Sequence, residues 1–120
     1  MDGAVIKLTE PVTAYERTFT EITLREPRGA LFMRLGQPRV PVTNFTAGSG
    51  YYVEREEAVR EYLLALIVVE QGDNMVPYAE GILAKVSLAD ALQLREALFG
   101  FFDQAAQRIA ARRQESSSSV

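Results

Sequence analysis

Hydrophobic and polar residues alternate near the start of the chain, which is the period of a half-buried β-strand. Residues 4–12 and residues 18–25 both show this alternation. In the second segment, Ile22 and Leu24 fall on the same face. Because only a short polar connection separates the two segments, they most simply pair as an antiparallel β-hairpin over residues 4–25. A lone hairpin is only marginally stable in water, so we expect it to pack against helices or to gain strands from another subunit.

The next part of the chain loses this alternation. Pro27 ends the second strand and can open a short helix over residues 28–35, which Gly36 ends. Residues 37–53 then follow no period and contain two prolines, two glycines and three aromatic residues. We therefore predict an irregular loop over residues 37–53, of a length that is typical of a mobile segment or a contact surface.

From Glu54 onward the hydrophobic period becomes helical. We predict a helix over residues 54–70, closed by Gly72, and a short helix from about residue 75 to residue 86. The first of these helices is apolar on all sides between Leu63 and Val69. A helix end of this kind belongs in a core or in an interface.

The clearest predicted element is a final helix over residues 87–112. Its first residues, from Ser87 to Asp90, resemble a capping box. Winding at about 100° per residue gathers the apolar side chains on an arc of roughly 180°. This arc contains Leu88, Ala91, Leu92, Leu94, Leu98, Phe99, Phe101, Phe102, Ala105, Ala106 and Ile109. Residues 114–120, which include four serines, are expected to form a disordered tail.

Together these elements predict one α+β domain over residues 1–113, with an N-terminal antiparallel β-hairpin followed by three or four helices, the C-terminal one longest. Its parts are the hairpin at 4–25, the irregular loop at 37–53 and a helical part at 54–113. A chain of 120 residues suits one domain, and a hydrophobic fraction of 48% suffices for a core.

Charge and hydropathy disfavour nucleic acid and membranes as partners. The 13 basic and 16 acidic residues are interleaved, as on a solvated surface. Only Arg108, Arg112 and Arg113 form a basic group, and cations at this position also suit the end of a helix. No apolar run approaches the length of a membrane span, and the N-terminus carries no visible secretory signal. We therefore expect a cytoplasmic protein.

The chemistry that the chain lacks argues against catalysis. It contains neither cysteine nor histidine, which removes thiolate chemistry, the usual general base at neutral pH and the commonest transition-metal ligand. Gly48-Ser49-Gly50 has no Walker lysine and indicates a plain turn. Glu54, Glu56 and Glu57 are expected to be solvated. We predict no enzyme, cofactor or metal, and a small carboxylate-based enzyme is the least favoured alternative.

The width of the apolar arc points instead to a protein partner. One neighbouring helix covers only about 100° of another, so the arc exceeds what the other elements comfortably cover. Either a second copy of the chain or a client helix covers the rest, or the hairpin and the loop complete the core of a monomer. The candidate partner-binding residues are Tyr51, Tyr52, Leu88, Leu92, Phe99, Phe102 and Ile109. For the two tyrosines, core and interface are equally favoured; for the phenylalanines, the core is favoured.

The order of short motifs resembles a known family. The first strand ends in Leu8-Thr9-Glu10-Pro11, and the second reads Ile22-Thr23-Leu24-Arg25-Glu26-Pro27. Leu88-Ala89-Asp90 leads into an apolar helix with paired Phe101-Phe102. These stretches are similar to phage tail assembly chaperones of contractile-tailed, Mu-like phages. The segments 37–53 and 62–69 depart from the pattern, the first by its length and the second by its weak amphipathicity.

The resemblance implies a function. Such chaperones bind the tape measure protein, a long helical client, and keep it soluble in the host cytoplasm until tail tube subunits polymerise around it. Many also occur in an extended form whose added domain recruits tube subunits. The alternative is a minor structural subunit of the virion, such as a tail or head-completion protein.

Overall fold

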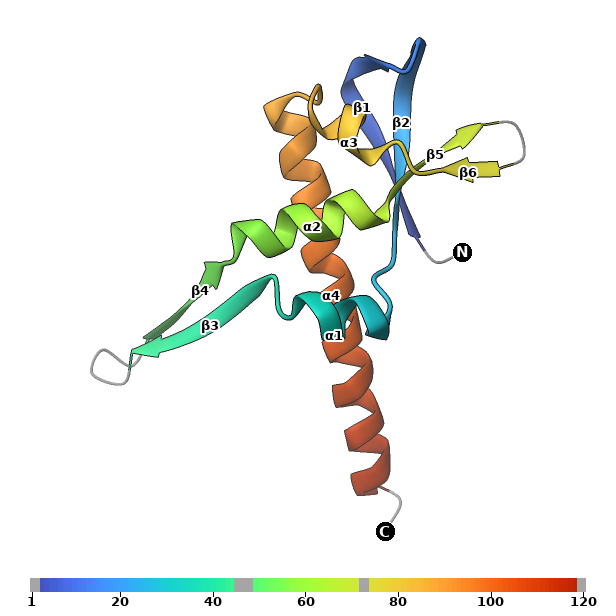
Figure 1. Cartoon of the computed structure of the whole chain (residues 1–120). Coiled ribbons are helices and arrows are strands. Elements are labelled where there is room, and N and C mark those ends of the chain that lie inside the picture. The colour runs from blue at the N-terminus through green and yellow to red at the C-terminus, as the bar shows by residue number, and fades with distance from the viewer. Residues whose placement is uncertain (1–2, 45–48, 72–73, 119–120) are drawn as a thin grey trace.

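The computed structural model describes residues 3–44, 49–71 and 74–118. The predicted fold class is confirmed: the chain is α+β, it begins with an antiparallel hairpin, and the C-terminal helix is the longest of the four helices in the described residues (Figure 1). The elements are β1 Gly3–Ala14, β2 Arg17–Arg25, α1 Gly29–Leu35, β3 Arg39–Asn44, β4 Ser49–Glu54, α2 Glu56–Leu66, β5 Ile67–Gln71, β6 Asn74–Val76, α3 Ala79–Leu83 and α4 Leu88–Ser118.

The turn between β1 and β2 is fixed by its own aromatic residue. Tyr15 and Glu16 have positive φ angles of 53° and 60°, and positive φ at both central residues is the signature of a type I′ turn. The ring of Tyr15 stacks on Tyr78 with 4.4 Å between centroids. Its hydroxyl accepts a hydrogen bond of 3.1 Å from the amide of Gly81 in α3. A Cβ atom at Gly81 would lie 2.6 Å from the Tyr15 ring, so this close approach requires glycine.

A large bulge interrupts the pairing of β1 with β2. Lys7 lies opposite Glu21 and Val12 lies opposite Phe19, so five steps along β1 match two steps along β2. The amides inside the bulge have no ladder partner on β2 and must be satisfied elsewhere.

Asp90 of α4 satisfies two of them, the amides of Thr9 and Glu10. Its side chain is completely buried, although the helical period places it on the polar arc. Its carboxylate accepts hydrogen bonds from the amides of Thr9 (2.8 Å) and Glu10 (3.3 Å) and from the side chains of Ser87 (3.0 Å) and Gln93 (2.8 Å). Burial alone would raise the pKa of the Asp90 carboxyl, but the bonds from the two amides and the Ser87 hydroxyl outweigh it and lower the pKa. The predicted cap is also present, because the Ser87 hydroxyl accepts the Asp90 amide at 3.2 Å.

The apolar run at 62–69 belongs to two elements. Helix α2 ends at Leu66, and the chain continues directly as the buried strand β5, so the prediction of one helix over 54–70 is wrong. The four-stranded sheet has the order β1-β2-β5-β6, and Ile67 and Val69 are both almost fully buried. Residues 74–76 form β6 and only residues 79–83 form α3, which corrects the predicted helix over 75–86.

Sequence predictions for the middle of the chain and for its C-terminal tail also need correction. Residues 39–44 and 49–54 form the β3–β4 hairpin, whereas an irregular loop was expected over 37–53. A plain turn was predicted at residues 48–50. Gly48 lies outside the described residues, and Ser49 and Gly50 are the first residues of β4. Helix α4 continues to Ser118, so residues 114–118 are helical; the remainder of the predicted tail lies outside the described residues.

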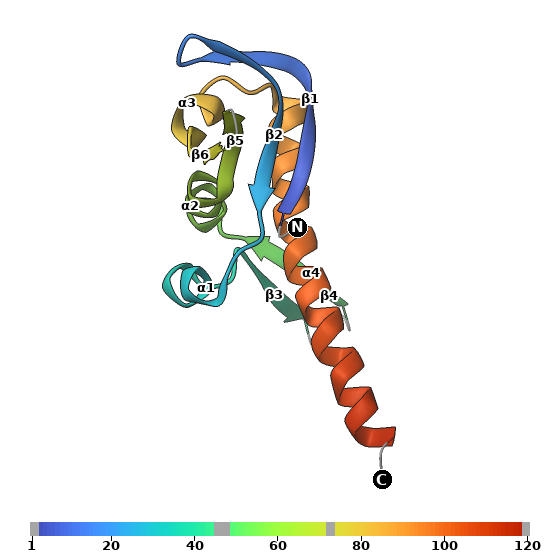
Figure 2. The same ribbon diagram turned by 90° about the vertical axis from the view of Figure 1, so that its right-hand side faces the viewer.

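The core lies between the β1–β2 hairpin and the helices α2, α3 and the first half of α4 (Figure 2). Its largest fully buried side chains include Ile22, Leu24, Tyr62, Ile67, Ile82, Leu94 and Leu98. In the described residues, no helix is both long and apolar enough to cross a membrane.

Two elements project from this core. The β3–β4 hairpin extends to one side, and the second half of α4 extends beyond α1 (Figures 1 and 2). As a result the radius of gyration is 17.1 Å, compared with about 14 Å for a compact domain of this length.

Candidate protein-binding groove

A groove of about 540 Å³ lies where the two projections meet the body of the protein. The hairpin, the start of α1 and the middle of α4 form its walls. We call it the α4 groove. Most of its lining is apolar, consisting of Pro27, Phe32, Pro41, Tyr52, Phe101, Phe102, Ala105, Ala106 and Ile109.

The wall from α4 follows directly from helical spacing. Phe102, Ala105, Ala106 and Ile109 stand at positions i, i+3, i+4 and i+7 and therefore share one face of the helix. Leu94, Leu98 and Phe99 of the predicted apolar arc are buried in the core, and Phe102 packs against its edge. The stripe then continues beyond the core. Ile109 is accordingly 54% exposed.

The wall from the hairpin is held by Arg39. Pro41 and Tyr52 lie opposite each other in the ladder, and strand alternation places Arg39 on their face. The Arg39 side chain forms an ion pair with Asp103 of α4. Its guanidinium also lies 4.6 Å from the ring centre of Tyr52 and 4.8 Å from that of Phe99. These cation–π contacts fasten the hairpin to the helix.

The floor of the groove is a cluster of aromatic rings. Phe102 packs edge-on against Tyr62, with 5.5 Å between ring centres, and at 5.9 Å from Phe32 of α1. The Tyr62 hydroxyl donates a hydrogen bond of 2.6 Å to the carbonyl of Gly36, at the end of α1. Burial raises the pKa of Tyr62, and the charge of Arg55 partly opposes that rise. Helix α1, which has no fully buried residue, therefore depends on α2 for its position.

Replacement of Tyr62 by phenylalanine is expected to lower the free energy of unfolding by about 1 kcal/mol, because it removes the hydrogen bond to Gly36 and keeps the ring contact with Phe102. Urea denaturation followed by circular dichroism measures this loss. An unchanged midpoint would show that the bond does not stabilise the fold.

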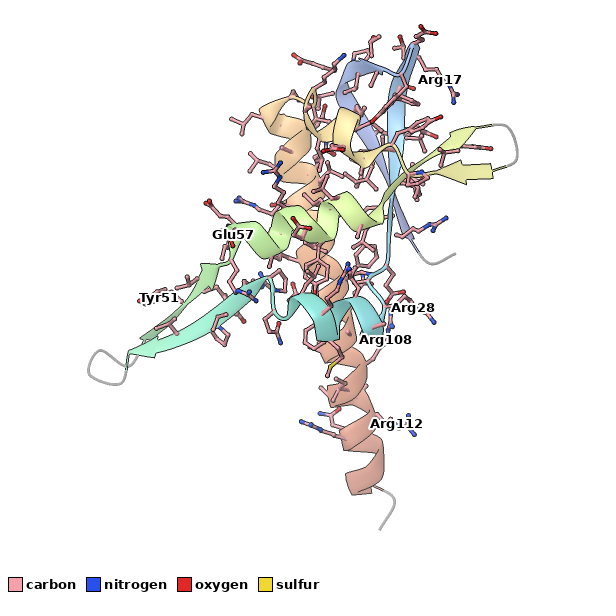
Figure 3. The ribbon with its side chains drawn as sticks, viewed as in Figure 1. Arg17, Arg28, Tyr51, Glu57, Arg108 and Arg112 are labelled. Carbon is pink, nitrogen blue, oxygen red and sulfur yellow. The ribbon has the colours of Figure 1, made fainter. Side chains whose placement is uncertain are left out.

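The predicted partner-binding residues fall into three groups. Tyr52, Phe102 and Ile109 line the α4 groove. Leu88 and Leu92 are exposed at the opposite end of α4 and remain candidates for a separate contact. Tyr51 is exposed on the other face of the hairpin, where Figure 3 labels it.

Phe99 takes the core position that was favoured for the phenylalanines. It is only 8% exposed and packs under Arg39, so it does not belong to the exposed part of the predicted set. Sequence reasoning missed Pro27, Phe32, Arg39 and Pro41, which reach the groove only through tertiary packing.

Both signs of charge occur at the rim of the groove. Glu26, Arg28, Arg39 and Asp103 lie there, and Arg108 on α4 pairs with Glu26 at 3.4 Å. Figure 3 shows Arg28 and Arg108 where α1 meets α4, with Arg112 farther along the helix. Because neither sign dominates, apolar contact is the main attraction that the groove offers.

The remaining surface carries less specific features. A larger hollow of about 790 Å³ lies against β1, β2 and β5, and its lining mixes apolar side chains such as Val5, Phe19 and Val68 with polar ones, including Thr18, Thr20, Glu21, Thr23, Arg25 and Glu70. The described residues contain no cluster of three or more His, Cys, Asp or Glu side chains that could hold a metal ion. Among them, Asp90 is the one buried charged side chain, and its oxygens already accept hydrogen bonds from the bulge.

Comparison with known proteins found no match to this chain among protein-family models, curated proteins or solved structures.

Proposed function

We propose that this chain is a tail assembly chaperone of a phage or prophage. It binds the tape measure protein through the α4 groove in the bacterial cytoplasm and keeps this client soluble during assembly of the tail tube. It acts by binding and not by catalysis. An extended form with an added domain would bring tail tube subunits to the same client.

The observation that carries this proposal is the solvent-exposed apolar stripe of α4 beyond the core. A long helical client exposes stripes of the same spacing, and a groove walled by a helix and a β-hairpin suits an amphipathic helix. The resemblance of the β1–β2 motifs and of the start of α4 to tail assembly chaperones supports the same client. A groove of this modest size with a mixed rim favours reversible binding, which a chaperone that leaves the finished particle needs.

Replacement of Ile109 by aspartate is expected to abolish this activity without unfolding the chain. The change places a charge on the α4 wall of the groove, whereas Ile109 lies outside the core and contributes little to its stability. The measurement is co-expression with the tape measure protein encoded in the neighbouring reading frame, followed by quantification of soluble client. We expect a loss of at least about tenfold, the effect of losing one well-placed apolar contact.

Met33→Asp is the matched control, because Met33 is an 82% exposed apolar residue of α1 that does not line the groove. Equal loss of client with both variants would contradict the assignment of the groove. Mass spectrometry of purified particles separates the proposed function from its rival, since a minor structural subunit persists in virions and a chaperone does not.

A further inference from the structure

The two strands of the β3–β4 hairpin differ in what their outer edges offer to another strand. Arg55, one step beyond β4, donates its amide to the carbonyl of Pro38 at 2.7 Å. Hydrogen-bonded and non-hydrogen-bonded pairs alternate along an antiparallel ladder, so the pair of Pro41 with Tyr52 is non-hydrogen-bonded. The main-chain groups of both residues therefore point outward, away from the partner strand.

Proline blocks one of these edges and leaves the other open. At the outer edge of β3, Pro41 has no N–H to donate, which is a common way to protect an edge strand. At the outer edge of β4, by the same alternation, Gly50, Tyr52 and Glu54 present their N–H and C=O groups. In the described part of the chain no other strand pairs with β4, and Figure 1 shows the hairpin extending away from the body of the protein.

We infer that β4 pairs with β4 of a second copy of this chain, so that two hairpins form one four-stranded antiparallel sheet. A two-fold axis at Tyr52 places Tyr52 opposite the Tyr52 of the second copy. In this register Gly50, Tyr52 and Glu54 can all form main-chain hydrogen bonds with the second strand. The same register puts Gly50 opposite Glu54, so no like charges face each other, and it puts Tyr51 opposite Val53. Residues 50–53 carry no charge that would oppose this pairing.

The hairpin has a physical need for such a partner. A two-stranded sheet is marginal on its own, and one face of this hairpin carries Val40, Tyr51 and Val53, all exposed. In the paired state, Tyr51 and Val53 gain cross-strand apolar neighbours from the second copy. The strand is complementary to itself, because the two-fold register sets the apolar Tyr51 against Val53 and opposes no like charges, and this favours a copy of the chain as the occupant of this edge. The inference is independent of the proposed client.

Single cysteines test the contact and its register, because the chain has no cysteine of its own. In a hydrogen-bonded pair the Cα atoms lie about 5.5 Å apart, within the range of a disulfide, whereas the two copies of residue 51 stand on a diagonal of roughly 7–8 Å. Under mild oxidation we expect Tyr52→Cys to form a covalent dimer efficiently and Tyr51→Cys to form little. The reverse order, or no dimer from either variant, would overturn the inference.

A proline variant tests the hydrogen bonds. Tyr52→Pro removes the outward N–H but no bond within the hairpin, whereas Tyr52→Ala keeps the N–H and removes only the side chain. Light scattering should give a mass that approaches twice 13.3 kDa with rising concentration for the wild type and for Tyr52→Ala. We expect Tyr52→Pro to dimerise at least about tenfold more weakly. A wild type that stays at 13.3 kDa, or a proline variant that dimerises as well as it, would refute the pairing.

Discussion

Replacement of Asp90 by alanine is expected to lower the free energy of unfolding by about 3 kcal/mol, because hydrogen bonds to a charged group are worth roughly 1.5–3 kcal/mol each and an orphaned amide adds a further cost. Asp90 accepts the amides of Thr9 and Glu10, which the bulge in β1 leaves without ladder partners. The alanine variant removes both acceptors at once, and it also removes a partner of the Ser87 hydroxyl at the start of α4. Urea denaturation gives the change in free energy.

The same residue predicts a dependence on pH. The pKa of Asp90 in the folded chain is lowered, so its ionised form stabilises the fold fully above the unfolded-state pKa of about 4. That contribution is lost as the pH falls through the folded-state pKa. An asparagine side chain does not titrate, so the stability difference between the wild type and the Asp90→Asn variant should be widest near neutral pH and should shrink below about pH 4.

Asp103→Ala is the matched control for both measurements. Asp103 lies on the same helix and is paired with Arg39, but it is exposed, and exposed ion pairs contribute about 0–1 kcal/mol. If Asp90→Ala were no less stable than Asp103→Ala, the buried carboxylate would not be securing the bulge.

Asp90 also shows where sequence reasoning stops. Alternation predicted the β1–β2 hairpin, and the Ser87-to-Asp90 motif predicted the start of α4. Neither pattern predicts the bulge in β1, because the register of β1 against β2 depends on how β1 packs against α4 and not on the local order of residues. The winding of α4 placed Asp90 with the solvated residues, since a helical wheel cannot show that a strand with two unpaired amides lies beside it.

The apolar run at 62–69 was ambiguous for a different reason. A short run of apolar residues fits a buried helix end and a buried strand equally well. Here the chain uses both, with Leu66 ending α2 and Ile67 starting β5. The β3–β4 hairpin was missed because its prolines and glycines indicate a loop; Pro41 is tolerated in β3 only because its nitrogen faces the free edge.

The α4 groove was half predictable. The helical period grouped Phe102 with Ile109, but it also included Phe99, which is buried in the core. The lengths of α1 and α2 and the placement of Phe32 determine where along α4 the core ends. The helical period of α4 alone cannot predict any of these. The opposite wall of the groove could not be predicted without the β3–β4 hairpin and its attachment to α4 through Arg39.

Replacement of Phe102 by aspartate is expected to lower the free energy of unfolding by about 3 kcal/mol and to abolish client binding with it. The ring of Phe102 contacts both Tyr62 and Phe32, so its loss removes two aromatic contacts at the junction of α1, α2 and α4. The new carboxylate would also lie among rings that offer it no hydrogen bond. Thermal and urea denaturation measure the loss, and the co-expression assay measures the binding.

Two companion variants separate the contributions of Phe102 to folding and to binding. Phe102→Leu keeps apolar volume and should lose less than about 1.5 kcal/mol. Ile109→Asp, on the same face of α4 but beyond the core, should lose binding at nearly wild-type stability. If Phe102→Asp were as stable as the wild type, the aromatic cluster would not join α1 to α4. The floor of the groove would then have no fixed shape for a helix to bind.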